Sequence, residues 1–169
     1  MILNLYLVRH GLATWPAGAW PGSDAERPLT PEGEHIIRAE GAALARLGLQ
    51  PDLILHSPLV RARQTAEIIA EALGLADRVR AHELLSPGFD HKALKKLLHE
   101  HAERESLMLV GHAPDMAQVV EKITGGAVKI KEGTVAHVKI EKPDESLKGT
   151  LIWLATAELL YTDSTEEHG

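Results

Sequence analysis

Two arginines and two histidines follow apolar segments of the chain, in positions that suit phosphoryl chemistry. Arg9 and His10 come directly after one apolar run, Arg61 comes shortly after a second, and His112 follows a third. Arginine offers forked, permanently charged donors that match phosphate oxygens two at a time. A neutral imidazole is a competent nucleophile near pH 7. The four side chains therefore suit the binding and transfer of a dianionic phosphoryl group.

Most other chemistries lack their residues. The chain has no cysteine, which excludes thiol catalysis, disulfides and zinc–thiolate sites. No phosphate-binding glycine loop, dinucleotide fingerprint or nucleophile elbow is present. No histidine spacing resembles a set of metal ligands, so we expect neither a metal site nor a cofactor. Phosphoryl transfer needs mainly alignment and charge neutralisation, and we expect the arginines and a protonated His112 to replace a metal ion.

Composition indicates an ordinary globular chain with no nucleic-acid or membrane role. It has 169 residues and a net charge of -6, whereas general nucleic-acid binders carry a basic stripe. No apolar run approaches the ~20 residues of a membrane helix, and the N-terminus does not resemble a signal peptide. We expect a cytoplasmic protein with a single domain over residues 1–161. Residues 162–169 are predicted to form a frayed polar tail.

Strand and helix patterns alternate along the chain. Strands are predicted at 2–8, 52–55, 79–81 and 107–110, helices at 31–47, 58–73, 90–105 and 114–123, and a C-terminal hairpin at 134–140 and 150–154. Thr30 and Ser57 are predicted to cap the first two helices, each followed by a proline in the first turn. The pattern predicts an α/β fold, a three-layer αβα sandwich with a mostly parallel sheet and an antiparallel C-terminal hairpin.

Three motifs resemble the histidine phosphatase superfamily, the phosphoglycerate-mutase-like group. They are Leu7-Val8-Arg9-His10-Gly11, Ser57-Pro58-Leu59-Val60-Arg61-Ala62-Arg63-Gln64-Thr65 and Val110-Gly111-His112, in the same order and strand context. Three further segments are similar to the small SixA-type phosphohistidine phosphatases: 27–33, 83–87 and 153–156. The resemblance extends along the whole chain.

This resemblance implies a role for each residue of the predicted site. His10 would attack phosphorus and become a phosphohistidine, which water then hydrolyses. The phosphoryl oxygens would be held by Arg9, Arg61 and His112 as phosphate-binding residues. Glu83 matches the position of the usual general acid. Independently of the resemblance, we expect one ring nitrogen of His10 to donate to a nearby carbonyl and so leave the other free.

The sequence also departs from parts of the superfamily. Ala113 stands after His112 where the histidine acid phosphatases have aspartate. Leu12 and Ala13 stand where mutases carry polar phosphate contacts. The short segment 84–106 leaves no room for a large capping subdomain, so we expect an open site. An open site favours a phosphoryl group displayed on a protein over a small metabolite that needs enclosure.

Three functions remain as alternatives. The first is removal of phosphate from a phosphorylated protein, namely a histidine phosphotransfer domain, in signalling. The second is hydrolysis of a small sugar or nucleoside phosphate, and the third is phosphate binding without turnover. Trp15 and Trp20 either border the pocket or fold back on the core. Packing roles are expected for His56 and Arg63.

Overall fold

A six-stranded sheet forms the centre of the molecule, and its order is β3-β2-β4-β1-β5-β6. The computed structural model describes residues 1–141 and 146–161. The strands are β1 (Ile2–Arg9), β2 (Leu53–His56), β3 (Val79–Ala81), β4 (Ser106–Gly111), β5 (Val135–Glu141) and β6 (Gly149–Ala155). The first four strands are parallel to one another, and β5 and β6 are antiparallel. The mostly parallel sheet and its C-terminal hairpin are confirmed.

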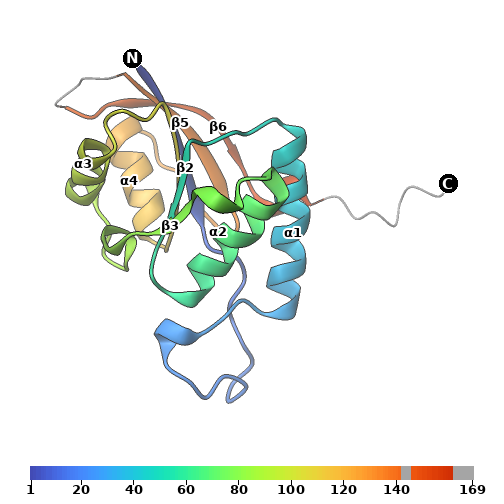
Figure 1. Cartoon of the computed structure of the whole chain (residues 1–169). Coiled ribbons are helices and arrows are strands. Elements are labelled where there is room, and N and C mark those ends of the chain that lie inside the picture. The colour runs from blue at the N-terminus through green and yellow to red at the C-terminus, as the bar shows by residue number, and fades with distance from the viewer. Residues whose placement is uncertain (142–145, 162–169) are drawn as a thin grey trace.

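Helices cover both faces of this sheet (Figure 1). They are α1 (Pro31–Arg46), α2 (Val60–Leu73), α3 (His91–Glu100) and α4 (Asp115–Thr124), with a short α5 (Ala157–Leu160) after β6. Strand β1 alternates between the two layers, because successive side chains point to opposite faces. Its Leu5 lies in a core with α3 and α4, and its Val8 lies in a second core with α1 and α2. The three-layer sandwich is therefore confirmed.

The strand register brings three predicted motifs to one edge of the sheet. Arg9 at the end of β1 pairs with Gly111 at the end of β4, and His56 at the end of β2 pairs with Val110. Parallel strands in this register finish at the same level, and ligands of open α/β sheets bind beyond those ends. The long segment between β1 and α1 projects past this edge (Figure 1).

The helix ends agree with the prediction at α1 and differ at α2. Thr30 caps α1, since its hydroxyl oxygen accepts a hydrogen bond from the Gly33 amide. The predicted Ser57 cap is wrong, because α2 begins at Val60 with Leu59 as its N-cap. Ser57 lies too far upstream to reach the free amides of the first turn. It makes a different contact, within the site described below.

The helix predicted over 90–105 is too long at its C-terminal end. Helix α3 ends at Glu100, and His101 leaves the helical conformation. The chain has to turn here to enter β4, and the Asp52 carboxylate accepts hydrogen bonds from the amides of Glu105 and Ser106. These contacts give the backbone a partner that is incompatible with a continued helix.

Three expectations, on location, domain organisation and the C-terminal tail, are not tested by the structure. None of the described helices has both the length and the apolar character needed to span a bilayer. The cytoplasmic location and the single domain over 1–161 stay predictions. The predicted frayed tail, 162–169, lies outside the described residues.

One carboxylate, Glu40 of α1, is completely buried, with 0% of its surface exposed. Neither of its oxygens has a hydrogen-bond partner among the described residues. Burial raises the pKa of Glu40 to about 8. The folded chain therefore retains a proton that the unfolded chain loses above the ordinary pKa of 4.5. The free energy of unfolding must decrease as pH rises from there through about 8.

Replacing Glu40 by methionine is expected to stabilise the protein at pH 8 by roughly 1–3 kcal/mol, because it removes an unpartnered carboxylate of similar length. The gain should shrink as pH falls toward 5. Urea unfolding at several pH values measures both effects. Glu32→Met, at an exposed position of the same helix, is the control and should change stability by less than about 0.5 kcal/mol. Equal stability of Glu40→Met and the parent at pH 8 would contradict the prediction.

Candidate active site

A pocket of about 330 Å³ lies at the sheet edge where β1 and β4 end. The side chains that line it are mostly charged or polar. They include all four residues proposed from the first three motifs: Arg9, His10, Arg61 and His112. They also include three charged residues to which the sequence analysis gave no role: Asp24, Arg27 and Glu132.

The ring of His10 is fixed with one nitrogen free. Its Nδ1 lies 2.7 Å from the carbonyl oxygen of Gly11, so Nδ1 carries the proton and donates it. The lone pair of Nε2 is therefore available. Burial, together with the positive charges of Arg61 and Arg9, lowers the pKa of His10 to about 4. At neutral pH the His10 ring is therefore uncharged, which is its nucleophilic form.

The segment after β1 is held tightly against two helices. A Cβ on Gly11 would lie 2.6 Å from Cγ1 of Ile37 in α1, so a larger residue would push the His10 turn away from the helix. The Gly11 amide donates to the hydroxyl of Thr65, and that hydroxyl donates to the Arg61 carbonyl. Thr65 thus joins the His10 turn to the helix that carries Arg61. It belongs to the second motif, but its link to Gly11 spans 54 positions of the sequence.

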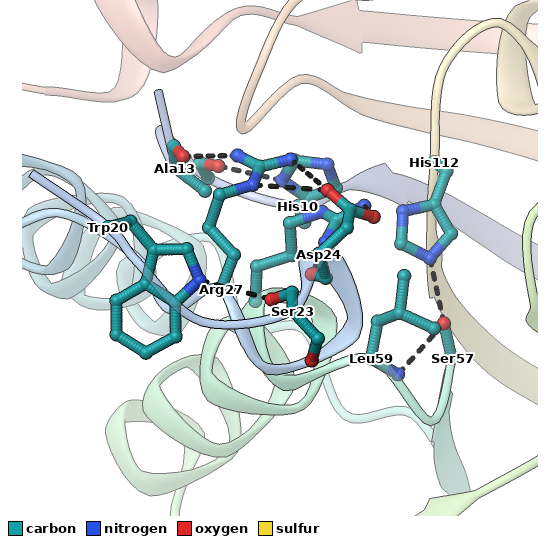
Figure 2. A network of polar contacts seen from close by, with 11 residues as sticks. His10, Ala13, Trp20, Ser23, Asp24, Arg27, Ser57, Leu59 and His112 are labelled. Carbon is teal, nitrogen blue, oxygen red and sulfur yellow. Dashed lines mark hydrogen bonds and ion pairs between the residues drawn. The ribbon is translucent and has the colours of Figure 1, made fainter. Parts of the chain in front are cut away.

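His112 lies edge-on to His10, with ring centroids 5.3 Å apart. Its Nε2 is 2.7 Å from the hydroxyl oxygen of Ser57, and this oxygen also accepts the amide proton of Leu59. The hydroxyl proton then has Nε2 as its acceptor. We assign the proton of a neutral His112 to Nδ1 on this basis, since no other acceptor for the Ser57 hydroxyl is found among the described residues, and Nδ1 itself has no hydrogen-bond partner there. Figure 2 shows that nitrogen on the side of the ring toward His10 and Asp24.

The structure favours a neutral His112, whereas the sequence analysis expected a protonated one. Burial, followed by the neighbouring His10 and Arg61, lowers the pKa of His112 to about 3. The sequence pattern could not reveal this, because it depends on how deeply the ring is covered. A neutral His112 still donates a hydrogen bond, because Ser57 directs its proton to Nδ1.

These lowered pKa values predict destabilisation in mild acid. Folded His10 and His112 stay neutral, while in the unfolded chain their pKa is near 6.5 and they take up protons below it. The unfolded state then binds more protons, so the free energy of unfolding decreases as pH falls from 6.5 toward about 4. Between pH 7 and pH 5 we expect a loss of roughly 1–2 kcal/mol per histidine, measured by urea unfolding. His10→Asn should lose about half of this pH dependence, and an unchanged slope would contradict the assignment.

The two predicted arginines are each held by an acidic partner. Arg61 is only 6% exposed, and it donates to the Asp24 carbonyl at 2.8 Å and to the Asp24 carboxylate at 3.2 Å. Arg9 donates to the Ile130 carbonyl at 3.1 Å and to the Glu132 carboxylate at 3.2 Å. The Nε of each arginine is buried without a partner among the described residues. These contacts fix the guanidinium groups and leave donors for an anion.

A third arginine reaches the pocket from the segment that projects past the sheet. Arg27 donates to the Asp24 carboxylate at 3.0 Å and to the carbonyl of Ala13. Figure 2 shows Asp24 between Arg27 and the His112 side of the site. The hydrogen bond from Arg27, followed by the charge of Arg61, lowers the pKa of Asp24. An ionised carboxylate thus already sits between two guanidinium groups, which is the arrangement that an oxyanion would need.

The remaining predicted residues lie outside the pocket. Glu83 is exposed, at the start of a single 3₁₀ turn (Glu83–Leu85), and does not line the pocket as described; Pro87 of the same segment does. Trp15 and Trp20 form a tilted pair, with ring centroids 6.4 Å apart, beside an adjacent hollow that also contacts Arg27. His56 is buried and Arg63 is exposed, and neither is among the described residues that line the site.

Comparisons with known proteins place the chain in a family. Residues 5–86 match the histidine phosphatase superfamily (branch 1). An uncharacterized protein of Picosynechococcus is 40% identical over 126 residues, which are 73% of this chain and 74% of that protein. The chain belongs to the histidine phosphatase superfamily. The solved structure of "the protein histidine phosphatase SixA complexed with tungstate" is 26% identical in sequence to this chain. The two structures superpose with a TM-score of 0.79, over 92% of this chain and 97% of that chain.

The SixA type is thereby confirmed, and the activity class is that of a phosphatase of the superfamily. A second group of relatives is also similar. The probable phosphoglycerate mutase GpmB of Serratia proteamaculans is 40% identical over 73 residues, which are 43% of this chain. The aligned part spans only 33% of that protein. The similar proteins thus include both a protein histidine phosphatase and a probable phosphoglycerate mutase.

Ser57 provides a test of how this site is organised. Ser57→Ala removes the proton that fixes the His112 tautomer, so phosphate release is expected to slow by about 2- to 10-fold, as for the loss of one hydrogen bond. Ser57→Thr keeps the hydroxyl and should recover most of the rate. Steady-state phosphate release measures both variants. If alanine and threonine slow the reaction equally, the hydroxyl does not act through His112.

Proposed function

We propose that this protein removes phosphate from phosphohistidine on a partner protein through a covalent intermediate on His10. One observation carries the proposal: a neutral His10 with a free Nε2 faces a pocket that contains three arginines and a second histidine. A nucleophile beside so much fixed positive charge suits attack on an anionic phosphoryl group.

In the first step, a bond forms between Nε2 of His10 and phosphorus, and the bond from phosphorus to the substrate's imidazole nitrogen breaks. The leaving imidazole takes up one proton from solvent. As His10 loses its lone pair to phosphorus, the ring becomes cationic and its Nδ1–H bond to the Gly11 carbonyl strengthens. Arg9 and Arg61 balance the charge on the phosphoryl oxygens, and His112 donates to them through Nδ1.

In the second step, water attacks phosphorus and the bond to Nε2 breaks. The attacking water releases one proton to solvent, and phosphate leaves as HPO₄²⁻. The lone pair returns to His10, which is again neutral because of its low pKa. The same donors serve both steps, since the phosphoryl group does not leave the pocket between them. Glu83 as the general acid stays a prediction, and a substrate whose leaving group is an imidazole needs little help from an acid.

Two observations support a protein-bound phosphohistidine as the substrate. The similar SixA structure is that of a protein histidine phosphatase, and its tungstate is an oxyanion with the shape of a phosphoryl group. The segment between β2 and β4 consists of α2, two single 3₁₀ turns, the edge strand β3 and α3, and it contains no capping subdomain among the described residues. A phosphoryl group carried on a protein surface can enter such a site.

A small phosphorylated metabolite is the second candidate. It is favoured by the similarity to the probable phosphoglycerate mutase GpmB, which is 40% identical to this chain over 73 residues. A pocket of about 330 Å³ also lies within the range of small-molecule sites. Under this alternative His10 and the arginines keep the same roles.

The deciding experiment compares the two substrates in one assay. Phosphate release from a phosphorylated histidine phosphotransfer domain is measured beside a panel of sugar, glycerate and nucleoside phosphates. We expect the protein substrate to have the higher kcat/KM by at least ~10-fold, and acid-labile phosphate to be trapped on His10 after rapid quenching. Faster turnover of a metabolite supports the second candidate. Tight phosphate binding with no trapped adduct would mean a binding module and overturn both.

A further inference from the structure

Three potential metal ligands meet at the C-terminal end of α3, away from the pocket. They are His82, which follows β3, and the neighbouring pair Glu100 and His101. Each offers one ligand atom, and the three atoms lie within 4.8 Å of one another. His82 Nε2 is 2.8 Å from a Glu100 carboxylate oxygen, and the rings of His82 and His101 have centroids 6.1 Å apart.

We propose that His82, Glu100 and His101 bind a Zn²⁺ ion. Two imidazoles and one carboxylate form a ligand set that zinc accepts, with water completing a tetrahedron. Imidazole nitrogens favour zinc and its transition-metal neighbours over Mg²⁺ and Ca²⁺, which prefer oxygen ligands. The sequence spacing does not indicate this site, because the fold brings His82 to Glu100 across 18 positions.

The cluster can reach zinc geometry through small side-chain movements. Bonds of about 2.0–2.2 Å in a tetrahedron place ligand atoms roughly 3.3–3.6 Å apart. The 2.8 Å contact between His82 and Glu100 has to open by about half an ångström, and wider spacings have to close. The Glu100 side chain is 39% exposed and that of His82 is 18% exposed, so neither is locked in a packed core.

The surrounding charges favour a cation at this position. Glu100 is the last residue of α3, where the unpaired carbonyls give the helix end a partial negative charge. The Glu100 carboxylate adds a negative charge and already accepts a hydrogen bond from His82 Nε2. Lys96 opposes a bound cation, but it is exposed, so solvent screens its charge.

Metal binding would require one proton to move within His82. The Leu84 amide donates to Nδ1 at 3.2 Å, so a neutral His82 carries its proton on Nε2 and donates it in a hydrogen bond to the Glu100 carboxylate. When Zn²⁺ takes Nε2, this proton is replaced and Nδ1 gains one, so the ring stays neutral. The Leu84 amide then loses its acceptor. Zinc binding would therefore remove a hydrogen bond from the 3₁₀ turn that carries Glu83.

Calorimetric titration with Zn²⁺ alone, in a non-chelating buffer, tests the proposal. His10 and His112 lie close enough to bind zinc as well, so the titrations use the His10→Ala variant as the parent. We expect this parent to bind one Zn²⁺. His82→Ala, His101→Ala and Glu100→Gln should each weaken binding by at least ~10- to 100-fold. His99→Ala, an exposed histidine of the same helix, is the matched control and should bind like the parent.

Cobalt gives a second readout that does not depend on affinity alone. Co²⁺ in place of Zn²⁺ should produce the visible absorption of a low-coordinate site in the parent, and this signal should disappear in His82→Ala and His101→Ala. Circular dichroism verifies that each variant is folded. Absence of zinc binding in the His10→Ala parent overturns the proposal. So does binding that persists unchanged in both His82→Ala and His101→Ala.

Discussion

His10→Ala is expected to reduce phosphate release by at least ~10⁴-fold, the largest effect of any single substitution in this protein. The reason is geometric, because Nε2 of His10 is the free lone pair of a ring whose other nitrogen is fixed on the Gly11 carbonyl. Alanine removes the nucleophile and leaves the arginines in place. Phosphate should therefore still bind, with an affinity changed far less than the rate, and no acid-labile phosphate should be trapped.

His56 offers a closely matched control for this experiment. It is the last residue of β2, whereas His10 directly follows β1, and its Nδ1 likewise lies 2.7 Å from the carbonyl oxygen of the next residue, Ser57. It is buried to a similar extent, but it is not among the described residues that line the pocket. His56→Ala should destabilise the fold while retaining turnover within about 10-fold. If the His10 and His56 variants lose activity equally, the loss reflects folding and His10 is not the nucleophile.

The central strands β1, β2 and β4 were predictable because most of their residues are apolar and buried on both faces of the sheet. An apolar run such as 107–110 has no polar alternation, and a short turn or cap residue marks its end. Once three such strands are parallel, their register leaves little freedom in where Arg9, His10 and His112 are placed. The core of the site was predictable for that reason.

The parts that could not be predicted depend on contacts between distant residues. Asp24 lies 37 positions from the Arg61 side chain it holds, and no local pattern indicates that pairing. Ser57 has the type and position of a helix cap, so its contact with His112 was missed. Burial is equally non-local, since Glu40 occupies a helix position that sequence alone would assign to solvent. Buried polar groups are the places where the local rules fail.

Arg61→Ala is expected to lower kcat/KM by about 10²- to 10³-fold, as for the loss of one preorganised donor to a developing charge. Arg61 is 6% exposed and held on its Asp24 side by two hydrogen bonds, so its position does not depend on the substrate. Arg61→Lys keeps the charge but not the planar fork, and it should recover only part of the lost rate.

A neighbouring arginine separates this effect from a general change in charge. Arg63 lies two positions further along α2, and its side chain is exposed. Arg63→Ala removes the same charge at a similar place in the sequence, and it should change kcat/KM by less than about 2-fold, as expected for a screened surface charge. Steady-state phosphate release by the three variants, at low and at physiological salt, measures the difference. An equal loss in the Arg61 and Arg63 variants would mean that long-range charge guides the substrate, and that Arg61 does not hold the phosphoryl group directly.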